Sequence, residues 1–78
     1  MAKEYDTFVE AIDELKDGKE MVLTIRDLET YEQRKVKAVV SSSKERLPGA
    51  DILRIRFSRG VPVEEPWAIK ITEELPLF

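Results

Sequence analysis

The chain has 78 residues, a formal net charge of −3 at pH 7, no cysteine and no histidine. The missing cysteines exclude disulfides and thiolate sites, and the missing histidines remove the commonest general base and the commonest nitrogen ligand of zinc. A chain this short buries only about 60–65% of its unfolded surface, which leaves a thin core and little room for an enclosed active site. We therefore expect a binding protein and not an enzyme, with no metal and no cofactor.

The charge is divided along the chain. Residues 1–20 hold three lysines against seven acids, residues 21–59 hold nine basic residues against five acids, and residues 60–78 hold one lysine against four glutamates. No apolar run approaches the roughly 20 residues that span a bilayer, and the first six residues lack the apolar core of a secretion signal. We expect a cytoplasmic protein with a basic middle segment.

The first predicted element is an amphipathic helix over residues 7–16. Its apolar residues recur at the spacing of one helical face, and Gly18 follows where a helix commonly ends. These apolar residues are Phe8, Ile12 and Leu15. Residues 20–26 then alternate at the period of a half-buried strand. The predicted inner side of this strand holds Met21, Leu23 and Ile25.

The next segment supports two predictions. Thr30 and Gln33 have the spacing of a capping box, and the apolar residues that follow trace one helical face up to Pro48-Gly49, a natural stop. A second helix is our preferred prediction. In the alternative, residues 35–41 form a strand that pairs with the first strand as a hairpin, because the run is rich in valine and serine is a poor helix former.

Two further strands are predicted over residues 51–58 and 67–72, joined by the stiff segment 62–66 and paired antiparallel. The inward residues are expected to be Leu53, Ile55, Phe57, Trp67, Ile69 and Ile71, and the outward residues of the last strand Ala68, Lys70 and Thr72. The predicted fold class is α+β. Residues 1–73 would form a single domain of order α-β-α-β-β, an antiparallel sheet with helices on one face.

This fold would present two basic surfaces that could bind DNA or RNA. The uncovered sheet face would carry Arg26, Arg54, Arg56 and Lys70. The outer stripe of the second helix would carry Arg34, Lys37, Ser41 and Lys44. Each surface also has a plainer interpretation, as a solvated face whose cations pair with nearby carboxylates.

The last five residues, Glu74-Leu75-Pro76-Leu77-Phe78, resemble the short peptide by which bacterial polymerases and repair proteins bind the replication sliding clamp, a motif of the type QLSLF or QLPLF. Leu75, Leu77 and Phe78 match its apolar anchors, while Glu74 stands where the motif has glutamine. The resemblance implies a docking peptide over residues 74–78. In the alternative, Leu77 and Phe78 fold back onto the core.

Two further resemblances concern the rest of the chain. The run 37–56, followed by 67–71, resembles short bacteriophage proteins of unknown role. Residues 18–22, 51–53 and 66–69 resemble, in the same order but with other spacings, segments of the phage inhibitor of uracil-DNA glycosylase. Together they imply a phage accessory protein or inhibitor whose protein partner is the host replication or repair machinery, most specifically the sliding clamp. Direct nucleic-acid binding is the alternative function, and a small module that associates through the Trp67 region is a third. The oligomeric state is left open.

Overall fold

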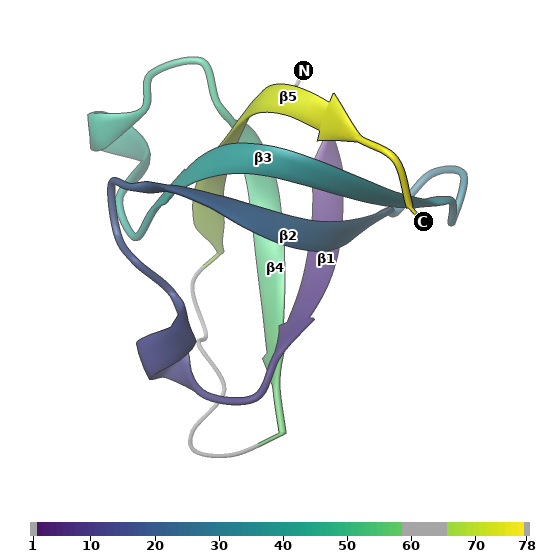
Figure 1. Cartoon of the computed structure of the whole chain (residues 1–78). Coiled ribbons are helices and arrows are strands. Elements are labelled where there is room, and N and C mark those ends of the chain that lie inside the picture. The colour runs from purple at the N-terminus through teal and green to yellow at the C-terminus, as the bar shows by residue number, and fades with distance from the viewer. Residues whose placement is uncertain (1, 59–65, 78) are drawn as a thin grey trace.

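Five β-strands close into a small barrel in the computed structural model, which describes residues 2–58 and 66–77 (Figure 1). Two single-turn 3-10 helices are the only helical segments in that part of the chain. In chain order the elements are β1 (Glu4–Val9), η1 (Ile12–Glu14), β2 (Glu20–Asp27), β3 (Gln33–Ser41), η2 (Lys44–Arg46), β4 (Asp51–Phe57) and β5 (Trp67–Leu75). The prediction of an α+β fold, a sheet with helices on one face, is therefore wrong.

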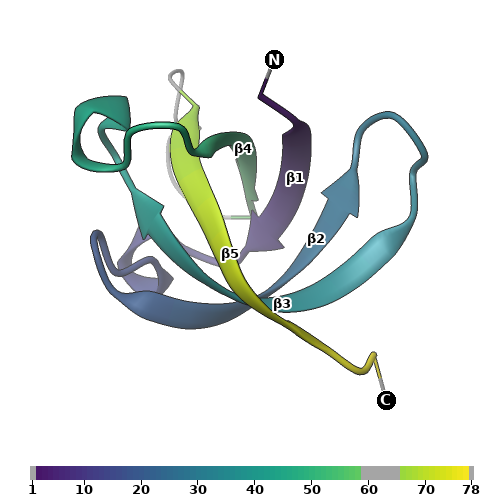
Figure 2. The same cartoon turned by 90° about the horizontal axis from the view of Figure 1, so that it is seen from above.

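The strands follow one another around the barrel in the order β1-β2-β3-β5-β4, and β4 returns to β1 (Figures 1 and 2). Four neighbouring pairs are antiparallel, and β1 with β4 is parallel. An odd number of strands cannot alternate in direction all the way round a ring, so at least one parallel pair is required. β1 and β4 supply that pair, in a register that runs from Glu4↔Ile52 to Val9↔Phe57.

Side chains that point inward from the five strands fill the barrel as one hydrophobic cluster. Leu15, just after η1, is buried in the same cluster, so the segment between β1 and β2 also contributes to the core. The other buried members are Tyr5, Val9, Leu23, Ile25, Val36, Ala38, Val40, Leu53, Ile55, Trp67 and Ile69.

The predicted first helix is wrong, because most of its first half belongs to strand β1. Tyr5, Thr7 and Val9 are all buried, which is the alternation of a strand, whereas Phe8 is 62% exposed. β1 is held on both sides, antiparallel by β2 and parallel by β4. Only the three residues of η1 are helical in this region.

The predicted second helix is also wrong, and the alternative hairpin is correct. β3 pairs antiparallel with β2 over the register Glu20↔Val39 to Arg26↔Gln33. Of the two residues that suggested a capping box, Thr30 lies in the turn between the two strands and Gln33 is the first residue of β3. That turn is organised by Asp27, whose Oδ1 accepts hydrogen bonds from the backbone N–H of Glu29 at 2.8 Å and of Thr30 at 3.4 Å.

The three predicted strands are confirmed as β2, β4 and β5, and β4 pairs antiparallel with β5 as expected. Their predicted inward residues are buried or pack against the core. Ala68 differs, since it was expected to point outward and is fully buried. β5 also extends to Leu75, so the predicted domain boundary at residue 73 lies inside a strand. The division into a domain over 1–73 and a docking peptide over 74–78 stays a prediction.

Candidate partner-binding site

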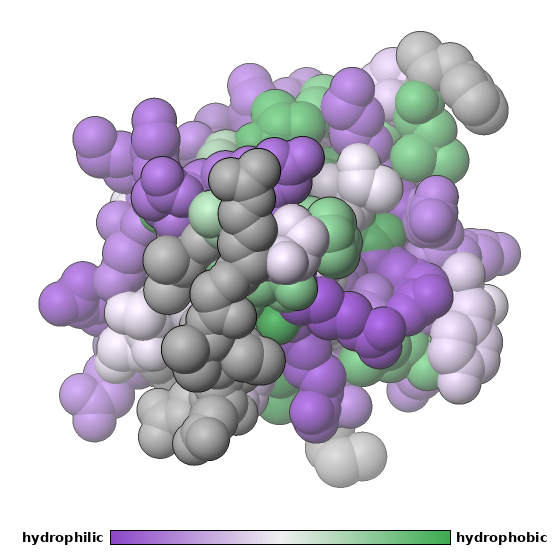
Figure 3. Space-filling model, turned by 90° about the horizontal axis from the view of Figure 1, so that it is seen from below, coloured by the Kyte–Doolittle hydropathy of each residue, from purple (hydrophilic) through white to green (hydrophobic). Residues whose placement is uncertain are grey.

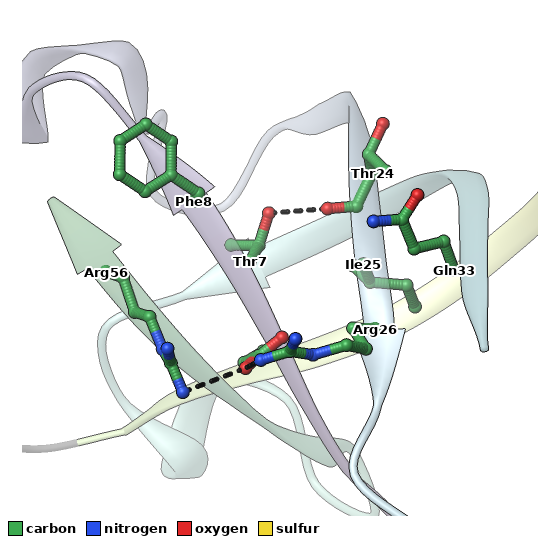
Figure 4. Close-up of a pocket in the computed structure, with 8 residues that line it drawn as sticks. Thr7, Phe8, Thr24, Ile25, Arg26, Gln33 and Arg56 are labelled. Atoms are coloured by element: carbon green, nitrogen blue, oxygen red, sulfur yellow. Dashed lines mark hydrogen bonds and ion pairs between the residues drawn. The ribbon is translucent and has the colours of Figure 1, made fainter. Parts of the chain in front are cut away.

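An open groove of about 320 Å³ lies on the outer surface of the barrel over β1, β2 and β4 (Figure 4). We call it the arginine groove. Its lining residues are Asp6, Thr7, Phe8, Thr24, Ile25, Arg26, Gln33 and Arg56. Beneath it, the hydroxyl of Thr7 donates a hydrogen bond of 2.8 Å to the backbone oxygen of Thr24, which ties β1 to β2 (Figure 4).

Asp6 lies at the centre of the arginine groove. The strand registers place it opposite Arg26 on β2 and opposite Arg54 on β4. Its Oδ2 accepts a hydrogen bond of 2.7 Å from Nη2 of Arg26 and lies 3.3 Å from Nη2 of Arg56. The residue is only 5% exposed. One buried carboxylate therefore faces two guanidinium groups, and this cluster of three side chains keeps a net charge of +1.

Arg26 is tied more closely to Asp6 than Arg56 is. Its hydrogen bond to Asp6 and the charge of that carboxylate raise the pKa of Arg26 above its ordinary value. The Nε of Arg26 is buried and has no hydrogen-bond partner within the described part of the chain. Arg56 is held at the longer distance and its side chain is 67% exposed. The guanidinium of Arg56 is thus the part of the pair that a partner molecule can reach.

Two exposed aromatic side chains lie near this cluster. Phe8 is 62% exposed, is opposite Arg56 in the β1–β4 register, and points away from the guanidinium groups (Figure 4). Tyr31 is 70% exposed and lies in the turn between β2 and β3, with a positive φ of 61°. Elsewhere the surface is mixed. Seen from below, hydrophobic residues appear in small patches between hydrophilic ones (Figure 3).

The structure only partly brings together the cations predicted for the sheet face. Arg26 and Arg56 meet at Asp6, and Arg54 lies beside them on β4 in an ion pair of 3.1 Å with Glu4. Lys70 is on β5, where it is opposite Val39 of β3. Because the sheet curves into a barrel, Lys70 lies on a different side of the molecule from β1.

The predicted stripe of the second helix does not exist, because its residues belong to strand β3 and to η2. Arg34 pairs with Glu74 through two contacts of 2.9 and 3.3 Å and stacks over the ring of Tyr5 at 5.8 Å. Lys37 lies 3.8 Å from Glu73. Lys44 is the first residue of η2, and its side chain lies outside the described residues.

The C-terminal residues begin as part of the barrel. Glu74 and Leu75 end β5, and the ion pair with Arg34 lowers the pKa of Glu74. Pro76 is exposed and Leu77 is 47% exposed, while Phe78 lies outside the described residues. The carboxylate of Glu74 is therefore already bound within the chain. The role of residues 74–78 as a partner-binding segment stays a prediction.

Sequence reasoning found Arg26 and Arg56 but missed Asp6, Phe8 and Tyr31. The pattern that could have predicted strand β1 is the alternation of Tyr5, Thr7 and Val9. It was not recognised because Thr7, a polar residue, occupies one of the inward positions. No pattern in the sequence indicated that Asp6 would be buried between two arginines.

No group of three or more carboxylate side chains in 2–58 and 66–77 is arranged to hold a metal ion. In the same ranges no helix is long and apolar enough to cross a membrane.

Comparison with known proteins identifies a matching family. The family model described as phenylphosphate carboxylase gamma subunit matches residues 3–77. No curated protein matches the chain, and no solved structure does. This match overturns the resemblance to bacteriophage accessory proteins and the functions inferred from it. Inhibition of host replication or repair through the sliding clamp, and regulation by direct DNA or RNA binding, are both wrong.

Proposed function

The chain belongs to the phenylphosphate carboxylase gamma subunit family, and from this premise we propose that it is a non-catalytic subunit that binds the other subunits of such a carboxylase. A gamma subunit is by definition part of an assembly, so the chain has protein partners. In this proposal the carboxylation of phenylphosphate takes place on other subunits, and the barrel contributes binding surface.

The exposed Phe8 beside the arginine groove carries the proposal. Aromatic residues and arginine are enriched where protein surfaces meet, and they account for much of the binding energy there. A phenylalanine ring that is 62% exposed loses contact with water when a partner covers it, which stabilises the complex. The adjacent guanidinium of Arg56 can donate hydrogen bonds to the same partner.

The chemistry of the groove supports binding more than catalysis. The carboxylate of Asp6 already interacts with two guanidinium groups, so it is occupied where a general base would need a free oxygen. The chain has neither histidine nor cysteine to serve in its place. The groove is also open to solvent, which weakens the electrostatic stabilisation of a transition state.

Reconstitution tests this proposal. The remaining subunits of the carboxylase are purified without this chain, and the chain is then added back at equal concentration. We expect it to co-elute with them in size-exclusion chromatography and to raise the phenylphosphate-dependent incorporation of labelled carbon dioxide. The chain alone should show no incorporation. Turnover by the chain alone, or separate elution at micromolar concentrations, would contradict the proposal.

A further inference from the structure

Resting on this proposed function, we infer that the arginine groove, with Phe8 at one end and Tyr31 at the other, binds an acidic segment of another subunit of the complex. One carboxylate of that segment pairs with the guanidinium of Arg56. Apolar side chains on either side of that carboxylate pack against the two rings.

The charge of the groove selects a carboxylate. The cluster of Asp6, Arg26 and Arg56 keeps one positive charge in excess, although the whole chain carries a net charge of −3. Charges on distant parts of the surface are screened beyond roughly 8 Å in physiological salt, so the excess charge of this cluster acts on a carboxylate that lies close to Arg56. A guanidinium binds a carboxylate through two parallel hydrogen bonds, and Arg56 is exposed enough to form them.

Tyr31 gives independent support. Its φ of 61° lies in the left-handed region that side chains other than glycine and asparagine rarely adopt. Burial does not offset this strain, because Tyr31 is 70% exposed. A strained and exposed aromatic residue at the tip of a turn is poorly explained by the stability of the barrel alone. Contact of the ring with a partner explains it.

The hairpin places Tyr31 beyond the Arg26 end of the groove. Arg26 pairs with Gln33 in the β2–β3 register, and Tyr31 lies two residues before Gln33 in the turn. Tyr31 is close enough to contribute, after Asp6, to the raised pKa of Arg26. Phe8 lies at the opposite end, with Thr24. Thr24 and Leu28, where the turn starts, are four positions apart along the chain, which is roughly 13 Å of strand.

This spacing defines the partner segment. A partner segment in extended conformation covers roughly 13 Å in four steps, and only every second side chain of it faces the groove. A segment with an apolar residue, an aspartate or glutamate, and a second apolar residue at alternate positions therefore fits the groove. The acidic residue lies over Arg56, and the two apolar side chains contact Phe8 and Tyr31.

The test measures the affinity of labelled variants for the purified assembly of the other subunits. The test variants are Phe8→Thr, Tyr31→Asn and Arg56→Gln, and the matched controls, outside the lining of the groove, are Val22→Thr and Lys70→Gln. We expect each test variant to weaken binding by about tenfold or more and each control by less than about twofold. Arg56→Lys should recover part of the affinity, because lysine keeps the charge without the bidentate geometry.

Two measurements separate binding from folding. The thermal unfolding midpoint of Tyr31→Asn should be unchanged or higher than that of the natural chain, because asparagine tolerates the left-handed conformation. The loss of affinity in Arg56→Gln should shrink as salt rises from 0.05 to about 0.5 M, as expected for a charge pair. A lower midpoint for Tyr31→Asn would overturn the role of Tyr31 in the interface.

The outcomes distinguish this inference from the function on which it rests. If the natural chain binds the assembly and all three test variants bind equally well, the groove is not the interface, and the subunit function stands. If the natural chain does not bind the assembly, the proposed function fails and the interface fails with it.

Discussion

Asp6 shows how one residue can link local stability to a surface. Its carboxylate is buried on the outer side of a strand, where it holds two arginines from two different neighbouring strands. Without it, Arg26 and Arg56 would repel each other across the groove. The same carboxylate fixes the direction in which both guanidinium groups point, so it positions the surface that we propose to be the interface.

Replacing Asp6 with asparagine tests this role. The Asp6→Asn variant should lower the free energy of unfolding by roughly 1–2 kcal/mol, a figure reduced from that of a fully buried pair because both arginines are partly exposed. Urea denaturation measures the change. The double variant Asp6→Asn with Arg56→Gln should recover part of the loss, since one of the two unpaired cations is removed. Equal losses in the single and double variants would show that repulsion between the arginines is unimportant.

At the scale of the element, β5 contains an irregularity that a single hydroxyl accommodates. The β3–β5 register shifts between Lys37 and Ala38, so that Lys37 is opposite Glu73 while Ala38 is opposite Ile71. Thr72 is the extra residue, and its hydroxyl lies within hydrogen-bond distance of two acceptors, 2.7 Å from Oε2 of Glu20 and 2.9 Å from the backbone oxygen of Lys37. A bulge of this kind interrupts the ladder and increases the local twist.

Thr72→Val should therefore destabilise the barrel by about 1 kcal/mol, because the carbonyl of Lys37 and the carboxylate of Glu20 lose the donor that they share. Thr24→Val is the matched control, since Thr24 is an exposed strand residue whose hydroxyl has no hydrogen bond within the described residues. Urea denaturation of the two variants provides the comparison. If both change stability equally, the hydroxyl of Thr72 has no special role at the bulge.

The elements also show what the sequence could and could not predict. The alternation in β2, β4 and β5 is regular, so these strands and their inward residues were predicted correctly apart from Ala68. β1 was missed because a polar residue, Thr7, occupies an inward position between Tyr5 and Val9 and so broke its hydrophobic pattern. β3 was misassigned because a short valine-rich run fits both periods, and only its pairing with β2 and β5 decides between them.

The candidate site was less predictable than the strands. Arg26, Arg54 and Arg56 were recognised as outward cations from alternation alone, and their exposure agrees with that. Their partners could not be inferred, because the nearest carboxylates come from β1, the strand that the pattern failed to reveal. The closure of the barrel separates Lys70 from these three arginines. Closure depends on the pairing of strands far apart in the chain, so no local sequence pattern predicts it.

At the scale of the whole molecule, several carboxylates tie segments together and should set its response to acid. Hydrogen bonds from Ser42 lower the pKa of Asp17, those from the backbone of Glu29 lower the pKa of Asp27, and the pair with Arg34 lowers that of Glu74. A carboxyl whose pKa is lower in the folded than in the unfolded chain stabilises the fold above its unfolded pKa, about 4. This stabilisation is lost as the pH falls through the folded pKa.

The free energy of unfolding should accordingly be nearly constant from pH 7 to about 5 and fall below about pH 4. Asp27→Asn, which removes one of these titrating groups, should be less stable at pH 7 and should show a shallower fall in acid. Urea denaturation of both chains across this pH range measures the difference. A fall that begins near pH 6, or identical slopes for the two chains, would contradict the assignment.

The parallel pair of β1 and β4 has a consequence for the order of folding. Its partners, such as Glu4 and Ile52, are 48 positions apart (52 minus 4), whereas β2 and β3 are joined by a short turn. Closing so long a loop costs more chain entropy than forming the hairpin, so the hairpin can form early and the ring must shut late. Until then the β4-facing edge of β1 stays open to other chains. We therefore expect refolding on a scale of roughly milliseconds to seconds, with aggregation of the refolding chain most pronounced before the ring has shut.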